Sequence, residues 1–348
     1  MKKFVLSTSK RYEVLIGRNL LADTGTYIKK CLPLPCKLCV ITDSNVNTIY
    51  TQTVLASLKE AGYTTSKIVF PAGEHSKNLT TYLNIMEALA DEGFTRSDAL
   101  VALGGGVVGD LAGFAAATYL RGISYVQIPT TYMSAVDSAV GGKTSINLQN
   151  GKNLAGAIWQ PSLVLCDCDT FDTLPDAKRR DGLAEAVKSA VVSDSSLLKH
   201  IKDGDAEYVI ERCISIKKSV VEVDERDYGL RQILAFGHTI GHGLEKLSSF
   251  SIPHGQAVAM GMVIEARAAY KMGLTENDLS GELTEILSEL GFKLKVKYSA
   301  DEIYHYALMD KKIHGDQITM VIPEFIGKCR LQKLSLSQLK KFIEAGLE

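Results

Sequence analysis

The sequence lacks net charge and long apolar stretches, and these two absences exclude whole classes of function. The 348-residue chain carries a formal net charge of −1, which gives it no electrostatic basis for binding nucleic acid or a membrane surface. No apolar stretch approaches the ~20 residues of a membrane-spanning helix, and no signal-peptide pattern follows Met1-Lys2-Lys3. We therefore expect a cytoplasmic protein without nucleic-acid or membrane partners.

Cysteine is scarce and follows no pairing pattern. The seven cysteines are odd in number and scattered, which fits a reducing compartment rather than a disulfide framework. Cys36 and Cys39 form a lone CxxC, but they lie at the apolar run 38–41 and no second pair follows. We interpret them as core thiols rather than a zinc or redox site. Cys166 and Cys168 share one face of an expected strand, so they are also expected in the core.

The first half of the chain alternates apolar runs with helical patterns. A hairpin is expected over residues 4–6 and 13–16, ahead of the main sheet. The strands expected next are residues 38–41, 67–70, 99–103 and 125–128, and the helices are 45–61, 79–92 and 107–119. This alternation predicts a Rossmann-like parallel sheet with helices on both faces, which binds ligands beyond the carboxyl ends of its strands.

The pattern changes after Asp167. From Pro175 onward the apolar spacing is helical, over residues 184–192, 206–223, 234–247, 257–272 and 279–290. A short strand is expected at 318–323. The predicted fold class is α/β, with an N-terminal sheet domain of residues 1–165 and an α-helical domain of residues 166–348. A cleft between the halves is the expected active site.

A glycine-rich loop follows an expected strand and opens a helix. It contains GxGxxG as Gly104, Gly106 and Gly109. Glycine permits φ > 0 and close backbone approach, and a helix N-terminus attracts phosphate, so the loop indicates a bound dinucleotide. The acidic residue usual ~20 positions later is missing, since that region reads 129-Pro-Thr-Thr-131. Asp43 is the candidate for the ribose instead, and a purely structural tight turn is the alternative.

Three of the seven histidines, His238, His242 and His254, fall within 17 positions of a glycine-rich stretch. The first two are four apart, so a helix places both on one face. Converging neutral imidazoles are a usual way to hold a divalent metal, which would imply Lewis-acid chemistry. No HExxH motif is present, so nothing supports a zinc protease. Satisfied core or capping histidines are the alternative.

Charged residues in tight turns and on an apolar helix are further candidates. Lys143 and Lys152 lie in glycine-rich turns, but Asp137 stands where a P-loop would need glycine. Glu185 and Lys188 share a helix face, and they either form a surface ion pair or place Glu185 in a Glu/His/His metal site. One cleft could gather further basic residues to hold a polyanionic substrate. These residues are Lys217, Lys218, Arg231, Lys311 and Lys312.

Together these segments resemble the 3-dehydroquinate synthase family of the sugar phosphate cyclases over nearly the whole chain. The order and spacing of the motifs carry the resemblance. They are residues 42–46, 71–77, 104–110, 121–122, 129–131, 136–138, 141–144, 151–153, 182–188, 229–231, 237–239, 241–242, 254–255 and 310–312.

The resemblance implies an NAD-binding α/β domain, a helical metal-binding domain and a lyase of the shikimate pathway of aromatic amino acid biosynthesis. Such enzymes convert the seven-carbon sugar acid phosphate DAHP into 3-dehydroquinate and phosphate. The steps are transient NAD-dependent oxidation, phosphate elimination, reduction and intramolecular aldol closure. The resemblance also implies a homodimer, in which Arg121 reaches the phosphate in the neighbouring subunit's site.

Residue roles are implied by the same resemblance, motif by motif. Zinc or cobalt would be bound by Glu185, His238 and His254. NAD would be contacted by Asp43, Glu74, Lys77, Gly105, Gly106, Val107, Asp110, Thr130, Thr131, Lys143 and Lys152. Substrate would be bound by Arg121, Asp137, Lys152, Asn153, and Lys311 or Lys312. The catalytic residues would be Lys143, Lys188, Lys217, Arg231 and His242.

Three positions depart from the family pattern. Ala235 stands where members usually carry Asn, so a hydrogen bond worth about 1–3 kcal/mol is missing unless something replaces it. Gln256 replaces the carboxylate that usually follows His254-Gly255, and Ala135 replaces a larger residue. These changes bear on substrate choice and rate more than on the fold.

Other functions are compatible with parts of this pattern. Another sugar phosphate cyclase, such as 2-deoxy-scyllo-inosose synthase or an aminodehydroquinate synthase, is the nearest alternative. A metal-dependent polyol phosphate dehydrogenase would share the two-domain layout but release NADH. A noncatalytic NAD- or sugar-phosphate-binding regulator would need no metal.

Overall fold

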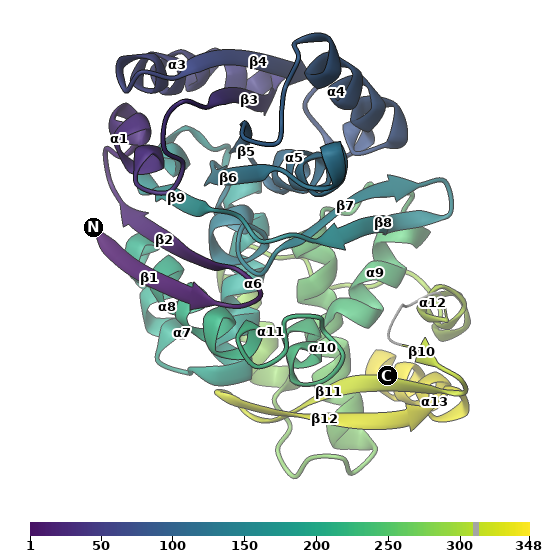
Figure 1. Ribbon diagram of the computed structural model, residues 1–348. Helices are drawn as coiled ribbons and strands as arrows, with labels where there is room; N and C mark the ends of the chain where they lie inside the picture. Colours follow the sequence, from purple (N-terminus) through teal and green to yellow (C-terminus); the bar gives the residue numbers. More distant parts are fainter. Residues whose placement is uncertain (309–312) are drawn as a thin grey trace. The chain divides into compact units, whose positions relative to one another are not determined.

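The computed structural model describes residues 1–308 and 313–348, and the chain divides into two compact units (Figure 1). Unit 1 is Met1–Leu174 and unit 2 is Pro175–Glu348. The predicted boundary at residue 165 falls inside strand β9 (Leu163–Asp167). That strand pairs in parallel with β2 (Arg11–Gly17) and β6 (Ser124–Pro129), which holds it in unit 1. The structural boundary therefore follows Leu174.

Unit 1 is built on a seven-stranded sheet in the order β1-β2-β9-β6-β5-β3-β4. Its remaining strands are β1 (Lys2–Ser7), β3 (Lys37–Asp43), β4 (Thr64–Phe70) and β5 (Ala99–Gly104). The β1 strand runs antiparallel to β2, and the other neighbours pair in parallel. The predicted parallel α/β sheet is confirmed. The N-terminal hairpin is an integral part of the sheet rather than a prelude to it, because β2 pairs with β9.

Helices cover both faces of this sheet. On one face, Leu38 and Val40 of β3 pack in a cluster with side chains of α1 (Thr24–Lys29) and α3 (Thr51–Glu60). On the other face, Cys39 and Ile41 pack with α4 (Leu79–Asp91) and α5 (Gly106–Thr118). Burial on both faces explains why the strands are continuous apolar runs.

The two thiols of the CxxC belong to these opposite clusters. Cys36 packs in the cluster of α1 and α3, and Cys39 packs in the cluster of α4 and α5. Burial raises the pKa of the Cys36 thiol to about 11 and that of Cys39 to about 12. Both are therefore protonated core thiols, which do not share a metal or redox site.

A second hairpin in unit 1 was not predicted. Strands β7 (Lys143–Leu148) and β8 (Gly151–Ile158) form a separate two-stranded antiparallel sheet (Figure 1). Its glycines and lysines resemble turn sequences, so the local pattern concealed the strands. The helix expected over 45–61 is also divided at Tyr50 into α2 (Ser44–Ile49) and α3.

Short helical turns complete unit 1. They are η1 (Leu21–Asp23), η2 (Glu74–Ser76), η3 (Tyr119–Arg121), the π-helical turn η4 (Ser134–Ser138) and η5 (Cys168–Thr173). Cys168 thus begins η5 and does not share a strand with Cys166, although both are buried.

Unit 2 is mostly helical, as predicted. Its helices are α6 (Asp176–Ser193), α7 (Leu197–Asp203), α8 (Ala206–Val221), η6 (Leu230–Ala235), α9 (His238–Leu247), α10 (His254–Lys271), α11 (Ser280–Glu289), α12 (Ala300–Ala307) and α13 (Leu336–Leu347). Helix α10 is buried along most of its length and packs with α9, α12 and α13 in one apolar core. Among the described residues, no helix combines the length and apolarity needed to cross a membrane.

The end of unit 2 holds more structure than the sequence pattern indicated. The short strand expected at 318–323 is the middle of β11 (Gln317–Phe325), which pairs with β10 (Ile313–His314) and β12 (Lys328–Ser335). Helices α12 and α13 were also missed, although each begins with a capping box, Ser299 with Glu302 and Ser335 with Gln338. That four-residue pattern is a readable helix-start signal.

Candidate functional site

The three predicted metal ligands converge in unit 2 from three helices. Glu185 lies within α6, His238 begins α9 and His254 begins α10. Glu185 Oε1 lies 3.4 Å from His238 Nε2 and 3.3 Å from His254 Nε2. One ligand atom of each residue lies within 4.8 Å of the other two. His238 and His254 lie 53 and 69 positions after Glu185 in the sequence. Helix packing thus brings the three residues to a spacing suited to metal binding.

The Glu185 carboxylate is incomplete without a cation. Its Oε2 forms an ion pair with Lys188, and both side chains are almost wholly buried. Its Oε1 is buried and has no hydrogen-bond partner among the described residues, which is costly for a carboxylate in a protein interior. A divalent metal between this oxygen and two imidazoles would satisfy it, and two His with one Glu is a donor set of catalytic zinc sites. The residues therefore fit a divalent metal.

The outer nitrogens of both imidazoles are engaged, which orients the rings. His238 Nδ1 lies 3.1 Å from the carbonyl oxygen of Phe236, and His254 Nδ1 lies 3.1 Å from Glu245 Oε2. If each Nδ1 carries the proton and donates it, each Nε2 keeps its lone pair for a metal. Sequence reasoning missed Glu245, which is 2% exposed. Its spacing of three from His242 on α9 was the available signal.

Opposing effects set the charge states of this cluster. Burial alone would raise the pKa of Glu185, but the Lys188 ammonium and His238 hold it well below its usual value. Burial lowers the pKa of His238. Burial would also lower the pKa of His254, but the nearby carboxylates of Glu185 and Glu245 raise it to about 10. Without a metal, the cluster therefore holds an ionised carboxylate, one neutral imidazole and one protonated imidazole, and a metal bound here would displace the proton of His254.

His242 lies beside the three ligands. Its ring centroid is 5.4 Å from that of His238 and 5.9 Å from that of His254. His242, Glu245 and His254 also form a group with metal-ligand spacing. We assign the metal to the Glu185 group, because Glu245 is already bonded to the outer nitrogen of His254.

Three predicted cationic residues of unit 2 are buried, which is unusual for lysine and arginine, whereas Lys218 is half-buried and forms an ion pair with Glu222. Lys188 is 2%, Lys217 8% and Arg231 2% exposed. Arg231 lies in η6, and its Nη1 donates to the carbonyl oxygen of Glu225 at 2.5 Å. Lys311 and Lys312 lie outside the described residues.

Gln256 forms two hydrogen bonds with the backbone of one other residue. Its Nε2 donates to the carbonyl oxygen of Lys293 at 2.7 Å, and its Oε1 accepts from the Lys293 backbone N–H at 3.1 Å. A glutamate could not make the first of these bonds. Gln256 therefore fastens the start of α10, near His254, to residue 293. Ala235 ends η6 and is half-buried, and Ala135 is buried in η4.

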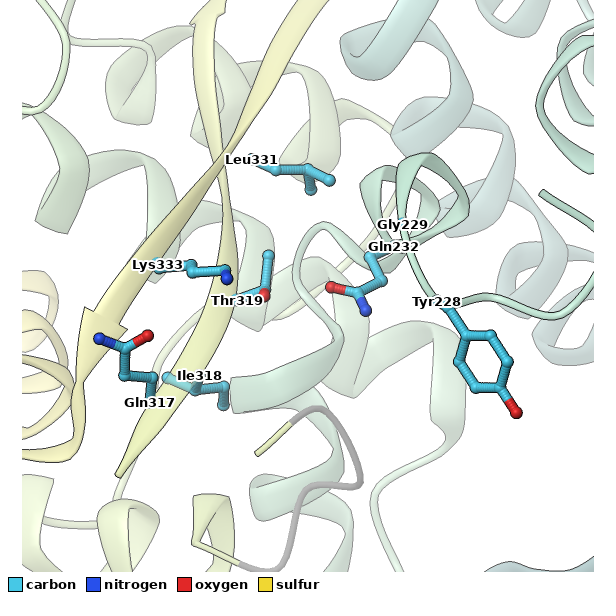
Figure 2. A pocket seen from close by; sticks show the side chains of 8 residues that line it. All are labelled: Tyr228, Gly229, Gln232, Gln317, Ile318, Thr319, Leu331 and Lys333. Atoms are coloured by element: carbon cyan, nitrogen blue, oxygen red, sulfur yellow. The ribbon is translucent and has the colours of Figure 1, made fainter. Parts of the chain in front are cut away.

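A cavity of about 310 Å³ lies elsewhere in unit 2. Figure 2 shows Gln317, Thr319 and Lys333 on the strand pair β11 and β12, and Gln232 on η6. The remaining lining residues are Tyr228, Gly229, Ile318 and Leu331. The lining does not include the metal-type residues, although it adjoins the segment that carries Arg231.

In unit 1, Lys77 and three other polar residues form a hydrogen-bonded network. The Lys77 Nζ pairs with Asp110 Oδ2 and donates to Asn153 Oδ1. Ser145 Oγ donates to the same Asn153 oxygen at 3.0 Å. Burial raises the pKa of the Asp110 carboxyl, although Lys77 opposes the shift. The network joins the segment after η2 to α5 and the β7–β8 hairpin, and Ser145 is the member that sequence reasoning did not single out.

The glycine loop lies between β5 and α5, as the motif predicted. Its glycines serve close packing and do not adopt positive φ. A Cβ on Gly105 would lie 2.8 Å from Thr131 Cγ2, and one on Gly106 would lie 3.1 Å from Ser138 Oγ. The loop is thus pressed against the segment after β6, where only glycine fits.

Buried hydroxyls near this loop fit a polar ligand. Thr130 follows β6, and its backbone N–H donates to the carbonyl oxygen of Gly104 at 3.0 Å. The side-chain hydroxyls of Thr42, Thr130 and Ser138 are buried and have no hydrogen-bond partner in the part of the chain that the structure describes. A loop that only Gly tolerates, beside a helix N-terminus and unsatisfied hydroxyls, fits a nucleotide phosphate or ribose.

The other predicted residues of unit 1 are placed as follows. Asp43 ends β3 and caps α2, because its Oδ1 accepts from the N–H groups of residues 45 and 46. Asp137 lies in the π-helical turn η4, an irregularity common at functional sites. The remaining positions are Val107 in the first turn of α5, Lys143 at the start of β7, Lys152 in β8 and Arg121, exposed, at the end of η3.

Comparison with known proteins agrees with this geometry. The model of the 3-dehydroquinate synthase N-terminal domain matches residues 67–181, and that of the C-terminal domain matches 182–313. The chain is 40% identical to 3-dehydroquinate synthase of Enterococcus faecalis (strain ATCC 47077 / OG1RF), with 100% of both proteins covered. It is 40% identical to that of Clostridium acetobutylicum, with 95% of this chain and 96% of the relative covered.

A solved structure shares the fold. It is 2-deoxy-scyllo-inosose synthase complexed with carbaglucose-6-phosphate, NAD+ and Co2+. The TM-score is 0.88 and the identity 27%, with 99% of this chain and 100% of that chain covered. The family models and the full-length relatives are decisive, and the chain belongs to the 3-dehydroquinate synthase family.

Proposed function

We propose that this chain converts DAHP into 3-dehydroquinate and inorganic phosphate with NAD and a divalent metal. As a family member it is a phosphate-eliminating carbon–oxygen lyase. The observation that carries the proposal is the unsatisfied Glu185 Oε1 facing two imidazole nitrogens. A metal ion would balance the charge of this oxygen. A protein that only bound NAD or a sugar phosphate would have no need of a metal beside buried lysines.

Each cofactor has a set of residues that fits it. Glu185, His238 and His254 would hold zinc or cobalt. NAD would be held by the glycine loop with Thr130 and Thr131, and by Asp43, Glu74, Lys77 and Asp110. When bound, NAD takes up and returns one hydride and the metal acidifies the hydroxyl to be oxidised.

Buried cations would hold the two acidic groups of the substrate. Lys143, Lys188, Lys217 and Arg231 would bind its phosphate and carboxylate, with Asp137, Lys152 and Asn153 beside them. A carboxylate matches the two-pronged geometry of a guanidinium. These residues act by positioning and electrostatic stabilisation, so the substrate's own phosphate can take the proton that its elimination requires.

His242 is placed to move protons at the ring hydroxyls. Its ring lies 5.4 Å from that of the metal ligand His238, centroid to centroid. An imidazole can both give and accept a proton through its two ring nitrogens. It would serve the ring opening and the aldol closure.

The decisive measurement is phosphate release from DAHP by the purified protein, with absorbance followed at the NADH band. Release that requires both NAD and zinc, without net NADH, is the expected result. Stoichiometric NADH would instead indicate a polyol phosphate dehydrogenase. Release from glucose 6-phosphate but not from DAHP would indicate the chemistry of 2-deoxy-scyllo-inosose synthase, and tight binding without any turnover would indicate a regulator.

We also propose a cytoplasmic homodimer in which Arg121 completes the neighbouring subunit's site. Its support is the family membership and the exposed position of Arg121, whose backbone has a φ of 69°. If Arg121 acts across the dimer, mixing inactive Arg121→Ala subunits with inactive Lys143→Ala subunits restores up to about a quarter of activity, by statistics of mixed dimers. Verified mixed dimers that stay inactive would contradict this arrangement.

A further inference from the structure

Asn147 lies at an irregularity of the β7–β8 hairpin. Ile146 pairs with Ala155 and Leu148 with Gly151, so this one residue of β7 stands opposite residues 152–154 of β8. Bulges of this kind re-aim side chains and are frequent beside active sites. No motif in the sequence gives Asn147 a role.

Three hydrogen bonds join Asn147 to three different proposed ligand-binding residues. Its backbone N–H donates to the carbonyl oxygen of Lys77 at 2.9 Å. Its Nδ2 donates to Glu74 Oε1 at 2.7 Å. Its Oδ1 accepts from the backbone N–H of Asn153 at 2.9 Å. The orientation of the amide is determined, because a carboxylate only accepts and a backbone N–H only donates.

The bond to Asn153 holds an uncommon backbone conformation. Asn153 has a φ of 57°, in the left-handed region that side chains other than glycine rarely adopt. In this conformation its Oδ1 accepts from Lys77 and Ser145. Asn147 therefore supports both the backbone that orients Asn153 and the carboxylate of Glu74.

We propose that Asn147 is a positioning residue that couples the cofactor contacts to a substrate contact. Its carboxamide holds Glu74 on one side and Asn153 on the other, with Lys77 tied to its backbone. The inference rests on the proposed function, which assigns Glu74 and Lys77 to NAD and Asn153 to substrate. No other side chain of similar size donates and accepts in this arrangement.

Two substitutions separate the effects of the two side-chain hydrogen bonds of Asn147, one to Glu74 and one to Asn153. Asn147→Asp keeps an acceptor for Asn153 but turns a carboxylate oxygen toward Glu74. We expect it to weaken NAD binding about tenfold while the KM for DAHP stays within about twofold. Asn147→Ala removes both side-chain hydrogen bonds, so NAD affinity falls and the KM for DAHP rises. NAD affinity is measured by calorimetry, independently of turnover.

Matched variants show whether the effect runs through Glu74. Leu148→Ala alters the next residue of β7, whose side chain is 44% exposed, and leaves both constants unchanged. Glu74→Gln combined with Asn147→Asp exchanges amide and carboxylate and restores the hydrogen bond. The NAD affinity of the double variant should then fall by less than the product of the single effects.

The outcomes distinguish this inference from the proposed function. Unchanged NAD affinity in Asn147→Asp, or strictly multiplicative effects in the double variant, overturns the positioning role of Asn147. A wild-type protein that neither binds NAD nor releases phosphate from DAHP overturns the proposed function itself. Thermal unfolding of each variant identifies any that has lost its fold, and the Asp and Gln variants preserve side-chain size.

Discussion

The two polar clusters differ in how completely their charges are satisfied. In unit 1, the Lys77 ammonium is already paired with Asp110 and bonded to Asn153. In unit 2, one oxygen of Glu185 faces two imidazole nitrogens and lacks a hydrogen-bond partner within the described residues. The charges of the first cluster are paired within it, whereas the second leaves one carboxylate oxygen in a position that fits a metal ion.

This difference separates two ways of building a binding site. The unit 1 cluster includes Asp110 of α5, the helix that begins at the glycine loop, where Gly105 and Gly106 pack against Thr131 and Ser138. In the unit 2 cluster, Glu185 has lost its contact with water, and the negative charge of a buried carboxylate must be balanced by nearby positive charge. We therefore expect NAD affinity to depend little on the metal ligands, and metal affinity to depend little on the Lys77 network.

The largest effect is expected for His254→Ala, which removes one of the three proposed metal ligands. Metal affinity and turnover should fall on the order of 10³-fold or more, beyond the ~100-fold loss typical of an outer-shell change. NAD affinity should stay within about twofold. Metal content, turnover and calorimetric NAD binding check this, with the exposed His305→Ala as control. Wild-type turnover by metal-depleted His254→Ala protein would refute the assignment.

Lys77→Met should give the next largest effect. The side chains of Lys77 and Asp110 are only 6% and 16% exposed, so the variant leaves a buried carboxylate without its cation. The expected cost is about 3 kcal/mol in the free energy of unfolding. Urea denaturation measures it, and adding Asp110→Asn should recover part of the loss. Weakened metal binding in Lys77→Met would break the separation of the two clusters.

Glu245→Gln tests how the metal ligand His254 is oriented. The amide can still contact His254 Nδ1, but it lacks the charge that strengthens the ligand. Metal affinity should fall about 10- to 100-fold, with all three direct ligands in place. Competition with a metal chelator measures this change. An unaltered affinity would show that Glu245 only fills space.

The smallest effect is expected for Asp224→Asn, at the loop before Arg231. Asp224 accepts from the backbone N–H groups of Tyr228, Gly229 and Arg231. Burial alone would raise the pKa of Asp224, but these donors lower it. The variant should lose about 1–2 kcal/mol of stability at neutral pH, since an amide accepts less strongly.

The pH dependence of that loss has a definite sign. A carboxyl whose pKa is lowered by folding contributes stability above its unfolded pKa, and the contribution disappears as pH falls through the folded pKa. The difference in unfolding free energy between wild type and Asp224→Asn should therefore narrow on acidification below the usual pKa of aspartate. A difference that is constant with pH would show that the Asp224 charge is not involved.

Sequence patterns anticipated the parts of the fold with strong local signals. The central strands of the parallel sheet contain continuous apolar runs, and the strands expected at 38–41, 67–70, 99–103 and 125–128 were confirmed within a few residues. The β7–β8 hairpin was missed, because residues 143–158 are rich in glycine and half-exposed. Near the C-terminus the strand expected at 318–323 was confirmed as part of β11, whereas β10, β12, α12 and α13 were missed, although the capping boxes of the two helices were legible. The predicted cleft between the halves stays a prediction.

The sequence by itself determined the chemistry available to this protein. It holds the histidines, the carboxylates, the lysines and a glycine loop in an order that resembles one enzyme family. The type of each donor and the position of each glycine can be read directly from the sequence. Only the tertiary structure decided which atoms meet. Packing of α6, α9 and α10 leaves Glu185 Oε1 facing two imidazoles, places Glu245 behind His254 and, in unit 1, lets Asn147 join three separate segments. These contacts link residues distant in sequence, and no local pattern encodes distances that arise from packing.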